Sequence, residues 1–191
     1  MGRPSAISIH DGNQFFGQHA PPGNEHGINI DFHEHKFGFA AHCLFPASQI
    51  IQDTAPSTHV YTNVLEVDNR IRTYPVPDYL KSPYDFPPIG AWSSSPLNAT
   101  RQYWSGGFRD YVLLYLHRPY CRDALFNRRG LPLQHQYGPS LLAACSAARR
   151  IYARSQAFYR AHPDKAGPLW FVWHSIYMGC VVMAALIVEK P

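Results

Sequence analysis

The sequence has few cysteines, and none of them is spaced for a metal site. Its 191 residues include four cysteines, far apart, with no C-x-x-C or other zinc-finger spacing. Each lies in or beside an apolar run, where a free thiol behaves as a small buried hydrophobe. The N-terminus lacks the apolar run of a signal peptide, so a reducing interior compartment is the default expectation. The cysteines are Cys43, Cys121, Cys145 and Cys180.

Charge is also sparse. Only 16% of the residues are charged, the formal net charge is +4 and the pI is about 8.9. A nucleic-acid-binding module clusters Lys and Arg on one face or along one helix. Here the only basic doublets are Arg128-Arg129 and Arg149-Arg150. The mild basic balance therefore gives no indication of a polyanion partner.

Known catalytic motifs are missing. The chain contains no G-x-S-x-G, G-x-x-x-x-G-K-[ST], H-E-x-x-H or G-x-G-x-x-G. The doublet Gly106-Gly107 is more typical of a turn before a helix than of a phosphate cradle. His117 and Arg118 could form a catalytic pair, but the sequence places no carboxylate beside them to orient the imidazole. An enzyme would need two or more of His117, Arg118, Asp110 and Asp123 to converge in one pocket. We predict no catalytic residue and no enzyme.

A cluster of potential ligands occurs early in the chain, at His33, His35, His42 and Cys43. Zinc needs three or four ligands that converge in space. On a helix, His33 and His35 point in divergent directions. We therefore predict no metal site and no cofactor-binding residue.

A central stretch, residues 108–126, is expected to organise the packing. Its apolar residues recur at helical spacing, and Pro119 interrupts the pattern. We predict two helical segments that meet at a bend, with the other apolar segments packed against them. The residues of the stripe are Phe108, Tyr111, Val112, Tyr115 and Leu116.

Other helices are predicted from the same spacing. A short helix is expected over 32–45, ending before Pro46, and another over 60–74, with Thr58 as a candidate N-cap and a Glu66–Arg70 pair. The apolar stripe of the second helix consists of Val64, Val67 and Ile71, and Val60 and Leu65 widen it. The longest helix should open at Pro139 and run about six turns. One face of it carries 141, 142, 145, 148, 151, 152, 155, 158 and 159, and the other side carries Arg149, Arg150, Arg154 and Arg160.

Residues 169–188 form a nearly continuous apolar run. The 20 residues are just long enough to span a bilayer, and His174, Ser175 and Gly179 are the breaks in it. Small and polar groups recur near every fourth residue, which suits packing against another helix. A buried central helix is the favoured interpretation, with a single membrane span at 169–188 as the alternative.

These segments predict an all-α protein, with an irregular helical domain over 31–188. Residues 1–30 are rich in Gly, Pro, Asn, His and Ser and are expected to be flexible or partly disordered. Within the domain, the Pro/Ser-rich residues 75–100 are expected to form a long surface loop.

Several segments together point to a family. They are YLHRPY at 115–120, Ala124-Leu125, YGPS at 137–140, LLAACSAARRI at 141–151 and LWFVWH at 169–174. Jointly they resemble the fungal-specific transcription factor domain, the helical regulatory region of binuclear zinc-cluster transcription factors. Residues 60–80 (VYTNVLEVDNRIRTYPVPDYL) resemble the helix and Pro-rich tail that precede this region in basidiomycete members. The resemblance covers about residues 36–188.

The resemblance implies a nuclear transcription regulator with an all-α regulatory domain. In that family an N-terminal six-cysteine cluster binds zinc and DNA, and this chain has no such cluster. The chain is therefore expected to be a fragment or a diverged member without its own DNA-binding module and without a cofactor. Its expected partner is another protein or the remaining segments of a longer transcription factor. The family gives the LHRPY segment no catalytic role.

Overall fold

The computed structural model describes residues 24–52, 56–85, 90–126 and 131–188. Of the interpretable residues 83% are helical and none is in a strand, which confirms the all-α prediction. The helices are α2 (Asn24–Phe39), the π-helical η2 (Ala40–Leu44), α3 (Phe45–Gln52), α4 (Thr58–Thr73), the short 3₁₀ helix η3 (Asp78–Leu80), α5 (Pro96–Phe126), the 3₁₀ helix η4 (Pro132–Gln134), α6 (Gly138–Ala161), α7 (Pro163–Ala166) and α8 (Trp170–Val188).

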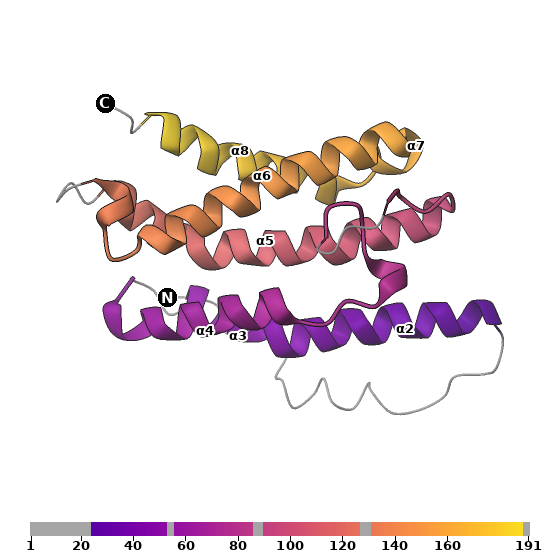
Figure 1. Cartoon of the computed structure of the whole chain (residues 1–191), viewed down its shortest axis with the longest axis horizontal. Coiled ribbons are helices and arrows are strands. Elements are labelled where there is room, and N and C mark those ends of the chain that lie inside the picture. The colour runs from indigo at the N-terminus through magenta and orange to yellow at the C-terminus, as the bar shows by residue number, and fades with distance from the viewer. Residues whose placement is uncertain (1–23, 53–55, 86–89, 127–130, 189–191) are drawn as a thin grey trace.

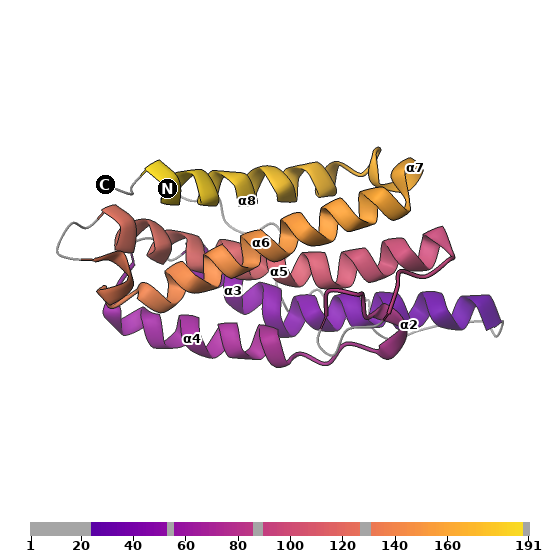
Figure 2. The ribbon, with the colours of Figure 1, turned by 45° about the horizontal axis from the view of Figure 1, so that its top comes forward.

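Helix α5 is the centre of the molecule. Figure 1 shows it between α6 on one side and α2, α3 and α4 on the other, with α8 as the outermost helix above α6. Figure 2 shows the same order from a second direction, with α8 running along α6. The most extensive helix pairing is that of α5 with α6, followed by that of α6 with α8. The central position predicted for 108–126 is therefore found.

The two-segment prediction for this region is wrong. Helix α5 is one helix of 31 residues, and Pro119 lies inside it. It is also longer than α6, which has 24 residues and was predicted to be the longest. Proline destabilises a helix interior, and packing offsets this because Leu116, Tyr120 and Cys121 are buried around Pro119. The glycines Gly106 and Gly107 are likewise inside α5 and not in a turn before it.

The predicted helix over 32–45 is part of a longer helical stretch. That stretch starts at Asn24 and continues through the π segment into α3, past Pro46. The Phe45 N–H donates to the carbonyl of Ala40, the wider i→i−5 bond of a π turn. This widened turn comes directly before Pro46, whose ring would clash with a regular preceding turn.

Helix α4 starts slightly earlier than predicted, and Ser57 caps it in place of Thr58. The Ser57 Oγ accepts a hydrogen bond from the Val60 N–H at 3.4 Å. The predicted pair of Glu66 and Arg70 is confirmed at 3.3 Å. Leu65, predicted to widen the apolar stripe, is exposed. The buried stripe consists of Tyr61, Val64, Val67 and Ile71.

The segment between α4 and α5 was predicted to be a linker or surface loop, but parts of it are buried. Leu80, Ser82 and Asp85 lie inside the protein. Its second half is held at Ser93, whose N–H donates to Gln102 Oε1 at 3.0 Å and whose carbonyl lies 3.2 Å from His162 Nε2. The predicted end at residue 100 is also shifted, because α5 starts at Pro96.

Helix α8 is half-buried. One side of it packs on α6 and α5, and the other side is open to solvent. A Cβ on Gly179 would lie 3.5 Å from the Ala148 carbonyl oxygen, so the two helices approach closely at this small residue. The prediction of a buried central helix is therefore correct for the burial of one face only, because α8 is the outermost helix of the molecule. The buried residues of α8 are Phe171, Val172, Ser175, Met178, Gly179 and Val182.

Candidate functional site

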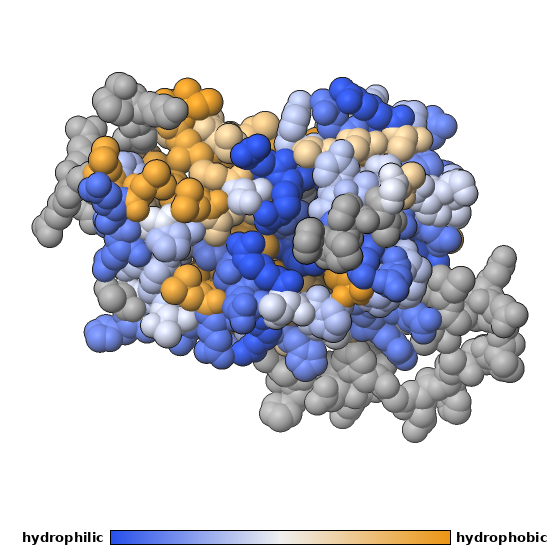
Figure 3. Space-filling model, in the orientation of Figure 1, coloured by the Kyte–Doolittle hydropathy of each residue, from blue (hydrophilic) through white to orange (hydrophobic). Residues whose placement is uncertain are grey.

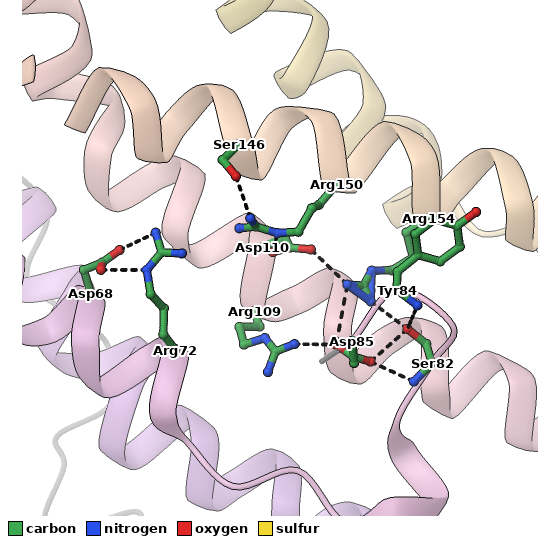
Figure 4. Close-up of polar contacts among 10 residues, drawn as sticks. All are labelled: Asp68, Arg72, Ser82, Tyr84, Asp85, Arg109, Asp110, Ser146, Arg150 and Arg154. Atoms are coloured by element: carbon green, nitrogen blue, oxygen red, sulfur yellow. Dashed lines mark hydrogen bonds and ion pairs between the residues drawn. The ribbon is translucent and has the colours of Figure 1, made fainter. Parts of the chain in front are cut away.

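A buried charged cluster joins α5, α6 and the loop that precedes α5. Figure 4 shows its side chains converging from these three parts of the chain. We call it the arginine–aspartate cluster, and it consists of Ser82, Asp85, Arg109, Asp110, Arg150 and Arg154. From the sequence, Asp110 was a candidate only for catalysis and Arg154 was expected on the outward side of α6.

Arg154 is the central residue of this cluster. It is 0% exposed, which corrects the prediction that it lies on the polar side of α6. Its Nη2 donates to Asp110 Oδ2 at 3.1 Å and lies 3.6 Å from Asp85 Oδ1. Its Nη1 donates to Ser82 Oγ at 3.0 Å. One guanidinium thus bonds to α5 and to two residues of the loop, using the fixed fork of donors that arginine presents.

The loop contributes its own hydrogen bonds to the cluster. Asp85 Oδ2 accepts from both the backbone N–H and the hydroxyl of Ser82, at 2.7 and 2.8 Å. Its Oδ1 accepts a hydrogen bond from Arg109 Nη2. Asp85 and Ser82 are buried, so the loop is fixed against the helices at this point.

The outer end of the cluster lies on α6. Arg150 Nε donates to Asp110 Oδ1 at 2.7 Å, and its Nη1 donates to Ser146 Oγ at 2.7 Å. Asp110 therefore bridges two arginines that are one helical turn apart. Two carboxylates face three guanidinium groups, so the cluster carries an excess of one positive charge.

Gly106 makes the space that the buried guanidinium occupies. A Cβ on Gly106 would lie 2.5 Å from Cζ of Arg154, and it would come closer still to Nη1. Gly107 lies beside the same side chain, since its Cβ would meet Arg154 Cδ at 3.8 Å. The glycine doublet thus serves helix packing, because interiors leave no room for a group that overlaps another.

This arrangement is suited to holding elements together. Both carboxylates accept hydrogen bonds from guanidinium groups, and the cluster contains no thiol or imidazole. Removing one partner of a buried ion pair costs about 3–5 kcal/mol, since it leaves an uncompensated charge. The cluster therefore fixes the loop, α5 and α6 in one arrangement.

A second buried network surrounds His117 and corrects the prediction that no carboxylate orients this imidazole. His117 Nε2 lies 2.9 Å from Asp68 Oδ1, and Nδ1 lies 2.9 Å from Ser140 Oγ. The Ser140 hydroxyl also lies 3.0 Å from the Tyr61 hydroxyl. The carboxylate comes from α4, 49 residues away in the chain, so only the folded structure shows the pairing.

Serine, histidine and aspartate are linked in the same order as in a hydrolase triad, but this network is buried where a catalytic triad would be open to substrate. Ser140 is 0% exposed and His117 is 1% exposed, so neither side chain reaches solvent. The serine oxygen is already bonded to His117 and Tyr61, and a nucleophile needs an open approach for substrate. The network links α4, α5 and the start of α6, and we interpret it as a structural connection.

Asp68 also bonds to Arg72 within α4, at 2.7 and 2.9 Å. Burial by itself would raise the pKa of Asp68. The hydrogen bonds from His117 and Arg72, together with their charges, more than offset this and lower its pKa to about 2.

The other residues considered as catalytic candidates do not join these networks. Arg118 is exposed and Asp123 is half-buried. His117 and Asp110 belong to different networks, so the four candidates do not converge in one pocket.

The early candidates for metal ligands are also dispersed. His35 Nε2 lies 3.2 Å from Ser105 Oγ, and Cys43 is buried with its thiol 3.9 Å from the Arg70 carbonyl. In the described part of the chain, no three His, Cys, Asp or Glu side chains are grouped to hold a metal ion.

The predicted apolar face of α6 is rotated from the buried one, and for this reason Arg154 was placed on the outer side. Leu142, Tyr152 and Tyr159 were assigned to the apolar face and are exposed. The buried stripe includes Ile151, Arg154, Ser155 and Phe158, at spacings of three, four and seven residues. Arg154 lies three residues from Ile151 and four from Phe158, and this helical spacing was the signal in the sequence that could have predicted its burial.

A groove runs between the C-terminal halves of α5 and α8. Its volume is about 540 Å³, and its apolar side is formed by Ile51, Leu125, Phe126, Val181, Val182 and Ala185. Arg118 and Arg122 line it, one helical turn apart on α5, and Pro119 lies between them. We call it the α5–α8 groove. Figure 3 shows hydrophobic side chains gathered at the end of the molecule where α8 ends.

Comparisons with known proteins give no match: no protein family fits this chain, and no curated protein or solved structure is similar to it.

Proposed function

We propose that this chain is a helical regulatory region of a fungal zinc-cluster transcription factor, and that it acts in the nucleus through contact with a protein partner. The DNA-binding zinc cluster of such a factor lies outside the residues present here. The partner is a separate protein or a further segment of the same factor. The support is the joint pattern of segments in residues 36–188, the all-α fold and the α5–α8 groove.

The α5–α8 groove is the observation that carries the proposal. Two residues of the LHRPY segment, Arg118 and Pro119, line it directly. Its lining residues Phe126 and Val181 are exposed, as are Ile187 and Val188 at the end of α8, although apolar surface is costly to leave in water. An apolar groove flanked by two arginines suits a helix with an apolar face and acidic residues at its edge.

A reporter assay tests the proposal. The chain would be fused to an unrelated DNA-binding module, and transcription from a reporter with the matching site would be measured. We expect a change in reporter output relative to the module alone. Val181→Asp, which places a charge in the groove, should remove most of that change.

Leu97→Asp is the matched control, because Leu97 is exposed at the opposite end of α5 and should tolerate the same substitution. An unchanged reporter with the fusion, although the fusion is folded and nuclear, would contradict the proposal. Equal effects of the two aspartate variants would contradict the role of the groove.

The isolated chain should bind DNA only negligibly and should hold no stoichiometric zinc. Fluorescence anisotropy with labelled duplex DNA at low and moderate salt should show only weak, salt-sensitive binding. Metal analysis of the purified protein should find no stoichiometric zinc, and stoichiometric zinc would contradict the assignment.

The membrane alternative has its own support in α8. The most apolar 18-residue window of Trp170–Val188 has a mean hydropathy of 2.0, and 33% of that window is buried. His174 Nε2 lies 2.9 Å from the Tyr111 hydroxyl on α5, a contact that fits either a docked helix or a helix in a membrane bundle.

Alkaline carbonate extraction separates the two. Recovery of the full chain in the soluble fraction supports a docked α8, whereas retention in the membrane pellet would favour the span. Val181→Asp should leave the chain soluble in the first case and release it from the pellet in the second.

A further inference from the structure

A small aromatic pocket lies between the N-terminal helical stretch and α5, away from the α5–α8 groove. Its volume is about 210 Å³. One wall comes from α2 and the π segment, and the other comes from α5. The residues that line it are Phe32, His35, Lys36, Phe37, Phe39, Ala40, Leu44, Trp104, Ser105 and Phe108.

The π segment shapes this pocket. Ala40 and Leu44, its first and last residues, both line the cavity. A π turn shifts the side chains that follow it out of the regular helical register, and such turns recur at functional sites. Ala40 contributes only a methyl group to this wall, so it takes up little of the cavity.

The α5 wall is held in place by further aromatic contacts. The Trp104 ring stacks on Phe171 of α8, with centroids 4.3 Å apart and planes at 8°. The centroid of the Phe108 ring lies 6.2 Å from that of Trp104 and 5.8 Å from that of Phe39, so aromatic rings from both walls border the cavity. Aromatic rings arranged in this way offer stacked and edge contacts to another flat ring.

Basic and polar groups lie at the edge of the pocket. Lys36 Nζ lies 5.2 Å from the centroid of Phe37, itself a lining residue. His35 Nε2 lies 3.2 Å from Ser105 Oγ on the opposite wall. Burial, and secondarily the charge of Arg109, lowers the pKa of His35. Among the described residues that line the cavity none is acidic, so its charge favours an anion.

The volume limits the size of a ligand. A dry apolar cavity of about 150 Å³ in a protein core takes up one benzene ring. The present pocket is larger than that cavity, and its additional volume allows a second fused ring. We propose that this pocket binds a small planar aromatic carboxylate of one or two rings, with its rings between Phe39, Trp104 and Phe108 and its carboxylate toward Lys36.

Isothermal titration calorimetry with 2-naphthoate tests the proposal on the full chain. We expect saturable binding at one site. The filling variant Ala40→Phe should weaken binding at least tenfold, because the new ring takes the place of the ligand. Circular dichroism and a thermal melt would establish that the variant is folded, and Leu44→Phe provides a second filling variant if it is not.

Two controls separate this site from others. Ala153→Phe, in the surface groove between α6 and α8, adds the same ring elsewhere and should leave binding unchanged. Lys36→Gln should weaken 2-naphthoate about threefold to fivefold, as expected for a partly exposed charge pair, and leave the neutral 2-naphthalenemethanol unaffected.

Absence of saturable binding to the wild-type chain would overturn the proposal. Equal affinity in a folded Ala40→Phe variant would place the ligand elsewhere and overturn it as well. If Lys36→Gln leaves the affinity for 2-naphthoate unchanged, the assignment of a carboxylate is overturned. The outcome does not depend on the transcriptional role, because binding is measured on the isolated chain.

Discussion

At the scale of single residues, Arg154 explains features of the sequence that otherwise look unrelated. Its guanidinium requires an acid on α5, polar groups on the loop and a residue without a side chain at position 106. Asp110, Asp85, Ser82 and Gly106 supply these. A buried charge is tolerated only when it is paired and hydrogen-bonded, and here Asp110, Asp85 and Ser82 meet that condition while Gly106 leaves the space.

Gly106→Ala should therefore destabilise the protein. Alanine in place of glycine inside a helix is normally stabilising by about 1 kcal/mol. Here the new methyl group overlaps the Arg154 guanidinium and displaces it from both carboxylates. We expect a loss of about 3 kcal/mol in the free energy of unfolding, measured by urea denaturation.

Gly90→Ala is the control, because a Cβ at that exposed residue meets nothing within 4 Å. Its stability should stay within about 0.5 kcal/mol of wild type. A Gly106→Ala variant as stable as wild type would mean that the guanidinium is not confined as described.

Asp68 gives the protein an acid-sensitive contribution to stability. Its pKa of about 2 lies below the ordinary value for an aspartate, so the folded state favours the carboxylate. This contribution is fully present above about pH 4, the range of the unfolded pKa, and is lost as the pH falls through about 2. It amounts to about 2 kcal/mol.

Asp68→Asn should remove it. We expect the difference in free energy of unfolding between wild type and this variant to be largest at pH 5 and to shrink toward pH 2, measured by urea denaturation at each pH. Asp164→Asn removes a carboxylate at an exposed position outside this network and is the matched control. A constant difference for Asp68→Asn would contradict the pairing with His117 and Arg72.

At the scale of elements, α5 is helical through Pro119 because its neighbours hold it. The proline removes one backbone hydrogen bond and strains the preceding turn, which costs about 3 kcal/mol inside a helix. Leu116 and His117 before it and Tyr120 and Cys121 after it are buried, and these contacts stabilise the helix across the defect.

Pro119→Ala should raise stability by up to about 3 kcal/mol, because the missing N–H is restored inside a continuous helix. The adjacent Arg118→Ala should change little, since Arg118 is exposed. Thermal melts of the two variants provide the comparison. A lower melting temperature for Pro119→Ala would show that packing in this region depends on the proline.

At the scale of the whole molecule, the core is divided into two clusters that are joined by residues packed against both. One includes Val64, Leu116 and Ile151, and the other includes Tyr103, Phe158 and Phe171. Phe108 and Tyr111 of α5 pack against both. The arginine–aspartate cluster adds polar links between α5, α6 and the loop.

The described helices should therefore unfold in one cooperative step. Tryptophan fluorescence reports mainly on Trp92 and Trp104, which pack against the second cluster, while circular dichroism at 222 nm reports on every helix. The two urea transitions should coincide. Separate midpoints would show that the two clusters are independent units.

The sequence alone determined the fold class and most of the helices. Apolar spacing located α4, α6 and the C-terminal part of α5, because that spacing follows from 3.6 residues per turn and depends on nothing distant. The nearly continuous apolar run at 169–188 located α8. The sequence also predicted the Glu66–Arg70 pair, whose partners lie on adjacent turns of one helix. It could not show which of several neighbouring stripes would be buried, so Leu142, Tyr152 and Leu65 were misassigned.

Only the tertiary structure decided the buried polar pairs. Arg154 meets Asp110 across 44 residues, and His117 meets Asp68 across 49, distances over which sequence carries no local signal. The same holds for α8, whose apolar residues suit a core or a bilayer equally well. It lies beside α6, where Gly179 lets the two backbones approach, and it contacts α5, where His174 finds a partner in Tyr111. Burial depends on what lies opposite a residue, and this is fixed only when the helices pack.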